Sequence, residues 1–219
     1  MRIEKILTLA TVCVGLIAFG LFIYRRVEVT RTATPVPVLT EVLDASALKP
    51  PTGAHVAIVE FEDMECPTCA YSNPILKKAA SQFAIPWIRH DFPLKQHVWS
   101  MKAAVNARWF DTLSKQTGDE YRDEVFSSQT SIQTQDDLSA FTKRFAASRK
   151  IVLPAELDPQ GTLAAAIRAD YDLGVRTGVA HTPTVWIVTD RGKGARYREA
   201  SIDLHDLNEM IGQALADTR

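Results

Sequence analysis

Two cysteines, Cys66 and Cys69, lie where a predicted strand meets a predicted helix. The residues VAIVEF at 56–61 are mostly apolar and β-branched, which is typical of a buried strand. Pro67 suits the first turn of a helix, and the helical pattern continues over residues 67–83. A short strand that leads directly into a helix requires a sheet against which that helix can pack.

The predicted order of elements indicates an α/β fold. Further strands are predicted at 86–92, 184–188 and 195–200, several helices lie between the second and third strands, and a helix predicted before the third strand stops at Gly174. The β-α-β opening implies parallel strands joined by a right-handed crossover, and the closing hairpin adds antiparallel strands. We therefore expect a mixed sheet with helices on both faces and a helical insertion at about 97–176.

The N-terminal region has the composition of a membrane anchor followed by a linker. Residues 6–24, ILTLATVCVGLIAFGLFIY, form an uncharged, mostly apolar run that is long enough for one transmembrane helix. We predict an uncleaved anchor within residues 1–31, and a cleaved signal peptide is the alternative. Pro-rich residues 32–54 are expected to be a linker, and 55–219 the main domain. The formal net charge of the whole chain is -1, so no basic excess points to nucleic acid.

The two cysteines in this setting point to redox chemistry. Cys66 falls at a helix N-terminus, where unpaired N–H groups and the helix dipole favour a thiolate and lower the pKa of the thiol. Cys69 follows one helical turn later, close enough to form a disulfide with Cys66. Exchange would run through a mixed disulfide on Cys66, which Cys69 resolves.

Two less reactive roles for the pair stay open. The pair could be half of a zinc site, but no second Cys-x-x-Cys exists, and the spacing of His90, His97 and His181 matches no zinc finger. It could also be a structural disulfide, although so short a loop gains little from a cross-link. The position of the pair between a strand and a helix favours a redox role.

Several segments together resemble the DsbA-like thiol:disulfide oxidoreductases of the thioredoxin superfamily. VEFEDMECPTC is similar to the active-site strand and helix start of that family. RHDFPL at 89–94 resembles its second strand, and His97 followed by AAVNARW resembles the start of its inserted helical domain. His181-Thr182-Pro183-Thr184 resembles its cis-proline segment. The resemblance covers roughly residues 55–215 and implies a thioredoxin-like fold.

The resemblance also implies a substrate-binding segment. Pro183 would follow a cis peptide bond and face the cysteine pair, which would expose the backbone of Thr182 to an extended substrate strand. The alternative is an ordinary trans proline that opens a strand. His181 would line the substrate groove, or act as a positive partner of the thiolate when protonated.

The same resemblance gives roles to residues near the cysteines. Glu60 would be a buried acid that exchanges a proton with the resolving thiol, and strand alternation supports its burial. The residues expected to tune the site are Pro67, Thr68 and Glu65. Because Glu65 and the nearby acids Glu62 and Asp63 carry negative charge, we expect them to raise the pKa of Cys66. The predicted potential therefore lies between about -270 mV for thioredoxin and about -120 mV for DsbA.

The sequence thus predicts a thiol:disulfide oxidoreductase, most simply a DsbA-like oxidase. It would act on cysteine-containing proteins or peptides without a metal or organic cofactor. A membrane redox partner would restore the cysteine pair, with the chain anchored through residues 6–24 in a bacterial inner membrane and its catalytic domain outside the cytoplasm. A membrane-tethered reductase, a non-catalytic binding module with the same fold, and a zinc-binding module are the alternatives.

Overall fold

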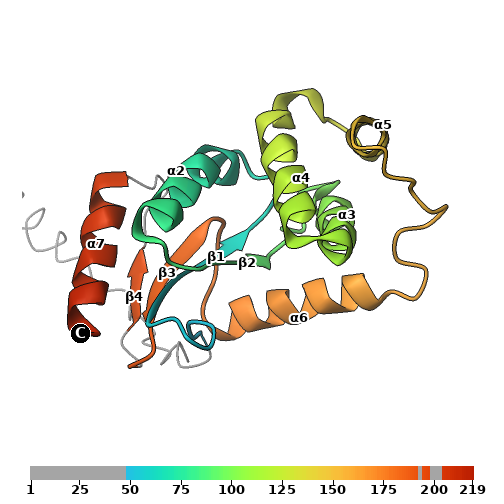
Figure 1. The fold of residues 1–219 in the computed structure, drawn as a ribbon. Coiled ribbons are helices and arrows are strands. Elements are labelled where there is room, and N and C mark those ends of the chain that lie inside the picture. Colours follow the sequence, from blue (N-terminus) through green and yellow to red (C-terminus); the bar gives the residue numbers. More distant parts are fainter. Residues whose placement is uncertain (1–47, 192–193, 198–203) are drawn as a thin grey trace, which may run out of the picture. The chain divides into compact units, whose positions relative to one another are not determined.

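The computed structural model describes residues 48–191, 194–197 and 204–219, and in this part of the chain four strands form one mixed sheet (Figure 1). The strands are β1 (Val56–Glu62), β2 (Trp87–Asp91), β3 (Thr184–Thr189) and β4 (Gly194–Tyr197). Their order is β2-β1-β3-β4. β1 and β2 are parallel, while β3 is antiparallel to both β1 and β4. The predicted mixed sheet is therefore confirmed.

Helices connect and cover these strands. They are α2 (Pro67–Phe83), α3 (Ser100–Leu113), α4 (Lys115–Ser127), α5 (Gln135–Ser148), α6 (Thr162–Arg176) and α7 (Leu204–Asp217), with a short 3-10 helix, η2, at Gln129–Ser131. Helices α3 to α6 lie between β2 and β3 in the sequence, as expected for the helical insertion.

The two faces of the sheet are covered by different helices (Figure 1). Apolar side chains of α2 and α7 pack on one face, where the buried residues are Val56, Ile58, Leu76, Ala79, Val185, Ile187, Leu207 and Ile211. The C-terminal part of α6 packs on the other face, where Tyr171 and Leu173 contact a buried cluster that includes Val59, Phe61 and Trp186. Strand alternation explains this division, because successive side chains of β1 point to opposite faces. Helices on both faces were predicted and are present.

The N-terminal predictions fall almost wholly outside the described residues. Residues 1–47 include the predicted anchor at 6–24 and most of the predicted linker. Within the described ranges, no helix has both the length and the apolar character needed to cross a membrane. Leu48, near the end of the predicted linker, is 5% exposed and belongs to the core cluster on the α6 face of the sheet.

Gly174 does not end a helix, so that prediction is wrong. Helix α6 continues to Arg176, and Gly174 is buried inside it. A Cβ at this position would lie 2.6 Å from ring atoms of Phe92 and 3.0 Å from the ring of Phe61. Gly174 therefore allows α6 to approach the sheet closely, because any side chain would collide with these rings.

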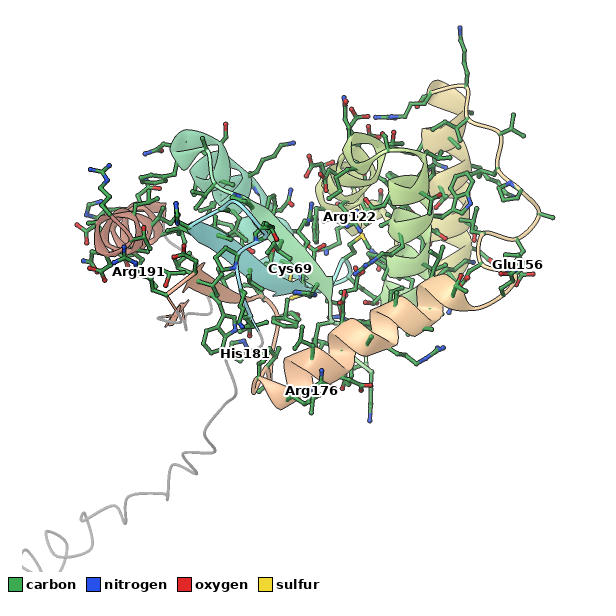
Figure 2. All side chains as sticks on the ribbon, turned by 60° about the horizontal axis from the view of Figure 1, so that its bottom comes forward. Cys69, Arg122, Glu156, Arg176, His181 and Arg191 are labelled. Atoms are coloured by element: carbon green, nitrogen blue, oxygen red, sulfur yellow. The ribbon has the colours of Figure 1, made fainter. Side chains whose placement is uncertain are left out.

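The inserted helices share a core that reaches the cysteine pair. Phe110 lies with its ring centroid 4.8 Å from that of Tyr121 and 4.9 Å from that of Phe145. Cys66 and Cys69 belong to the same buried cluster. Figure 2 shows Cys69 where the sheet and α2 meet the inserted helices. The fold therefore places the cysteine pair where the sheet with α2 meets the helical insertion.

Candidate active site

The cysteine pair occupies the first turn of α2, as predicted. Cys66 is the N-cap residue, and its carbonyl accepts the first helical hydrogen bond from Ala70 N–H (3.1 Å). Pro67 is exposed and Thr68 is half-buried. Cys66 is 6% exposed and Cys69 is fully buried, and both are free thiols. A proline at the first helical position is favourable because its missing N–H would have no partner in the helix.

The surroundings of the two thiols shift their pKa values in opposite directions. Hydrogen bonds from the Cys69 thiol and from the N–H groups of Cys69 and Thr68 lower the pKa of Cys66 to about 5, although burial opposes this shift. Burial raises the pKa of Cys69 well above its ordinary value, and its hydrogen bond to Cys66 adds to that rise. Cys66 is therefore a thiolate at neutral pH, while Cys69 keeps its proton.

The loop before β3 brings a proline beside Cys66. The Thr182–Pro183 peptide bond is cis, which confirms the predicted geometry. Cys66 Sγ lies 3.4 Å from the carbonyl oxygen of Thr182, to which it donates a hydrogen bond when it is protonated, and the two residues are 116 positions apart in the sequence. Thr182 and Pro183 are buried, whereas His181 is exposed and its carbonyl accepts from the Thr184 hydroxyl (2.7 Å).

Glu60 is buried in β1, as strand alternation predicts. It is 1% exposed, and one carboxyl oxygen accepts a hydrogen bond from the indole N–H of Trp87 (3.0 Å). Its other oxygen is buried with no hydrogen-bond partner among the described residues. Burial, together with the nearby charge of Glu62, raises the pKa of Glu60 to about 8. Glu60 therefore holds its proton at neutral pH and is poised to release it over a small change in its surroundings.

This raised pKa makes stability depend on pH. The unfolded chain loses the Glu60 proton near its ordinary pKa of 4.5, whereas the folded chain keeps it up to about 8. The stabilisation is therefore complete below the unfolded pKa and is lost as pH rises towards the folded pKa. Between about pH 5 and about pH 8, we expect the free energy of unfolding of wild type to fall by a few kcal/mol more than that of Glu60→Gln. The size of this difference follows from the size of the Glu60 pKa shift. Urea unfolding of both proteins at the two pH values measures this, and parallel pH profiles would contradict it.

The acidic residues before the cysteines bind the start of the insertion. One oxygen of Glu65 accepts from the N–H of Val98 (3.0 Å), and the other accepts from the N–H groups of Trp99 (2.6 Å) and Ser100 (2.9 Å) at the beginning of α3. Asp63 accepts from Leu94 N–H (2.7 Å). Neither carboxylate is a leading cause of the Cys66 pKa shift, which is downward rather than the upward effect expected from these acids.

Gln129, which the sequence analysis did not single out, also holds the cysteine loop. From η2, its side-chain amide donates to the carbonyls of Met64 (2.8 Å) and Cys66 (3.0 Å). A lone glutamine between two helices carries no pattern that would reveal this contact. The insertion thus supports the loop from two sides, through the start of α3 and through η2.

A buried ionic cluster joins the sheet to the insertion. Arg89 of β2 donates to Glu62 of β1 through Nε (3.0 Å) and Nη2 (2.7 Å), and both side chains are almost fully buried. Arg122 of α4, labelled in Figure 2, has its Nε 3.6 Å from Oε1 of Glu62. Its two terminal nitrogens form a bidentate salt bridge with Asp111 of α3. This cluster fixes the helices relative to the sheet, because a buried charge requires its partner.

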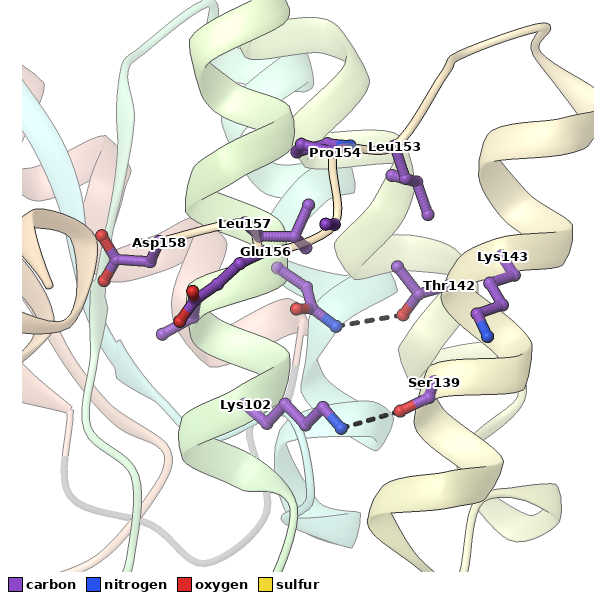
Figure 3. Close-up of a pocket in the computed structure, with 12 residues that line it drawn as sticks. Lys102, Ser139, Thr142, Lys143, Leu153, Pro154, Glu156, Leu157 and Asp158 are labelled. Carbon is purple, nitrogen blue, oxygen red and sulfur yellow. Dashed lines mark hydrogen bonds between the residues drawn. The ribbon is translucent and has the colours of Figure 1, made fainter. Parts of the chain in front are cut away.

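A cavity inside the insertion is separate from the cysteine pair. It has a volume of about 450 Å³ and lies between α3, α5 and residues 153–158 (Figure 3). On its wall, Lys102 donates to Ser139 (2.7 Å) and Asn106 donates to Thr142 (3.0 Å). The described residues contain no group of three or more His, Cys, Asp or Glu side chains that could hold a metal ion.

The mixed sheet, with a cysteine pair at the start of α2, is the fold of a thioredoxin-like protein. The family model described as thioredoxin matches residues 51–211, and the chain belongs to this family. No curated protein sequence is significantly similar to the chain.

Several solved structures are similar to this chain in fold. Wolbachia pipientis alpha-DsbA1 has a TM-score of 0.64 at 18% identity, covering 80% of this chain and 98% of that one. Bacillus subtilis BdbD in its oxidised form has a TM-score of 0.63 at 19% identity, covering 76% and 91%. The thiol-disulfide exchange protein alpha-DsbA2 of Wolbachia pipientis has a TM-score of 0.61 at 18% identity, covering 75% and 84%. At these identities the similarity establishes the shared fold.

Proposed function

We propose that this chain is a thiol:disulfide oxidoreductase that exchanges disulfides with cysteine-containing proteins or peptides through Cys66 and Cys69. The observation that carries the proposal is the opposite ionisation of the two thiols, with the pKa of Cys66 lowered to about 5 and that of Cys69 raised. Exchange needs an ionised nucleophile beside a thiol that can replace its captured partner. The names of the structural relatives are consistent with this chemistry.

The reaction in the reducing direction has two balanced steps. The Cys66 thiolate attacks a substrate disulfide, forms a mixed disulfide and releases one substrate sulfur as a thiolate, which takes up a proton. Cys69 then loses its proton and attacks Cys66 Sγ, which closes the Cys66–Cys69 disulfide and releases the second substrate sulfur. The oxidising direction runs through the same mixed disulfide in reverse, so the substrate loses two electrons and the protein gains them.

We favour a DsbA-like oxidase as the direction. A stabilised Cys66 thiolate stabilises the reduced protein, which makes its disulfide a stronger oxidant. A pKa of about 5 falls between about 7 for thioredoxin and about 3.5 for DsbA. This supports a potential between about -270 mV and about -120 mV. A membrane redox partner would then reoxidise the pair. A reductase fed by a membrane electron carrier uses the same residues in reverse.

The surrounding residues receive roles under this proposal. Glu60, a proton carrier whose pKa of about 8 lies near neutrality, would exchange a proton with Cys69 during the second step. The Thr182 backbone, held by the cis bond before Pro183, would pair with an extended substrate strand beside Cys66, and exposed His181 would line that groove. The residues proposed to tune the thiolate are Pro67 and Thr68, whereas the Glu65 carboxylate, expected from the sequence to act on the thiolate, binds the start of the insertion instead. No metal or organic cofactor is required.

The location of the protein stays a prediction from the sequence. Residues 6–24 would anchor the chain in a bacterial inner membrane, with the cysteine pair outside the cytoplasm. Such a compartment is oxidising, which suits an enzyme that forms disulfides.

Equilibration with glutathione and two activity assays test the function. Oxidised protein should oxidise a dithiol peptide, and reduced protein should reduce insulin. The fraction of reduced protein in glutathione buffers gives its potential, and a value nearer DsbA than thioredoxin supports the oxidase direction. Absence of both activities would leave the non-catalytic binding module as the better account. Stoichiometric zinc in the purified protein would instead favour a metal site.

A further inference from the structure

Asp63 lies between the end of β1 and the cysteine pair, and both oxygens of its carboxylate are hydrogen-bonded. It is 2% exposed. One carboxylate oxygen accepts from Glu65 N–H (2.8 Å), and the other accepts from Leu94 N–H (2.7 Å). This second oxygen also lies 2.8 Å from Nδ1 of His97. Three donors from the loop and from the segment after β2 therefore hold this side chain in one orientation.

The backbone of Asp63 contacts both cysteines. Its N–H donates to Cys69 Sγ (3.4 Å), and its carbonyl accepts from Cys66 N–H (3.0 Å). Because Cys69 is fully buried, a charge that forms on its sulfur depends on donors supplied by the protein. The N–H of Asp63 is such a donor, and it favours the ionised sulfur.

We infer that Asp63 is a positioning residue for Cys69, and that its bonds to Leu94 and His97 hold its N–H against the resolving sulfur. This inference rests on the proposed function. When Cys69 attacks Cys66 Sγ in a mixed disulfide, it must first become a thiolate, and in the reverse direction it leaves as one. The same N–H stabilises that charge in both directions, so Asp63 acts on the step that makes or breaks the bond to Cys69.

Glu65 offers a matched comparison within the same loop. Its carboxylate also accepts three hydrogen bonds from the start of the insertion, one on one oxygen and two on the other. In the described part of the chain, however, its hydrogen bonds run to Asp63 and to the start of the insertion rather than to Cys69. Asp63→Asn and Glu65→Gln therefore each place an amide N–H₂ against a donor, whichever way the amide turns, but only Asp63→Asn disturbs a group bonded to Cys69 Sγ.

Reaction with glutathione disulfide separates the two chemical steps. The full-length protein carries Cys13→Ala, so that Cys66 and Cys69 are its reacting thiols. Reduced protein is mixed with glutathione disulfide, quenched with acid at intervals, and weighed by mass spectrometry. The glutathione adduct on Cys66 appears in the first step and disappears in the second, when Cys69 closes the disulfide. Urea unfolding of each variant monitors the fold.

We expect Asp63→Asn to slow the second step about tenfold, the value of one hydrogen bond to a charged group, and the first step less than about threefold. The adduct then accumulates. Glu65→Gln should slow the second step less than about threefold at a similar loss of stability. His97→Ala removes one of the three contacts of Asp63 and should slow the second step about threefold, which keeps the test open if Asp63→Asn fails to fold.

Equal second-step rates in Asp63→Asn and Glu65→Gln, or in His97→Ala and wild type, would overturn the inference. In that case wild type still forms and resolves the adduct, so the proposed function survives. If wild type forms no adduct on Cys66, the proposed function itself fails and the inference falls with it.

Discussion

Cys66→Ala should abolish disulfide exchange, with the rates of insulin reduction and dithiol-peptide oxidation falling on the order of a thousandfold or more. The reason is that Cys66 carries the thiolate, with a pKa of about 5, whereas the buried Cys69 keeps its proton. Cys69 is fully buried, so it cannot replace Cys66 in meeting a substrate. Initial rates of both assays, measured on folded protein, check this expectation.

The other two cysteines provide the controls for this loss. Cys13→Ala removes the third cysteine of the chain and should leave both rates at the wild-type level. Cys69→Ala should let Cys66 capture substrate but leave the mixed disulfide unresolved, so that covalent adducts accumulate. Substantial exchange by Cys66→Ala would show that another group is the nucleophile.

Arg89→Met should lower the free energy of unfolding by about 3–5 kcal/mol. The guanidinium of Arg89 donates two hydrogen bonds to Glu62 and a third to Asn73 (3.0 Å). The side chains of Arg89 and Glu62 are 4% and 1% exposed, so water cannot replace the lost partner of the carboxylate. Urea unfolding measured at neutral pH gives the size of the loss.

The double variant Glu62→Leu/Arg89→Met separates the cost of an unpaired charge from the value of the pair. Replacing both members of a buried ion pair with apolar side chains is often close to neutral, whereas removing one member is not. Arg122 remains in this variant and keeps its two bonds to Asp111 (2.9 and 2.7 Å), but its buried Nε loses its ion pair with Glu62. We expect the double variant to recover part of the stability lost in Arg89→Met. A double variant less stable than Arg89→Met would show that the two residues do not act as a pair.

The strands and the sheet could be predicted from the sequence because their signals are local. VAIVEF and TVWIV are apolar, β-branched runs, and the structure places strands at Val56–Glu62 and Thr184–Thr189. The helix after the cysteines was predicted at 67–83 and has those bounds. Gly174 was misread because a glycine that ends a helix and one that allows close packing look alike in a sequence. The distinction depends on Phe92, more than eighty positions earlier.

The reactive residues of the candidate site could be predicted from the sequence, whereas the hydrogen bonds that hold the cysteine loop in place could not. The burial of Glu60 followed from strand alternation, and the cis bond before Pro183 followed from the family resemblance. The acidic residues before the cysteines were expected to act on Cys66 only through their negative charge. Whether a carboxylate faces water or an N–H group depends on distant segments, and here Glu65 meets the start of α3. The run of acids in FEDME was the available signal, whereas Gln129 had none.

The rate of alkylation of Cys66 as a function of pH measures directly whether its thiol is ionised at neutral pH. Reduced full-length protein carrying Cys13→Ala is treated with limiting iodoacetamide, and peptide mass spectrometry assigns the label to Cys66 or Cys69. Keeping Cys69 matters, because its hydrogen bond is the largest cause of the low Cys66 pKa. With a Cys66 pKa of about 5, the rate constant for Cys66 should rise through a midpoint near pH 5 and be level at neutral pH. A midpoint near the ordinary cysteine pKa of about 8.5 would contradict it.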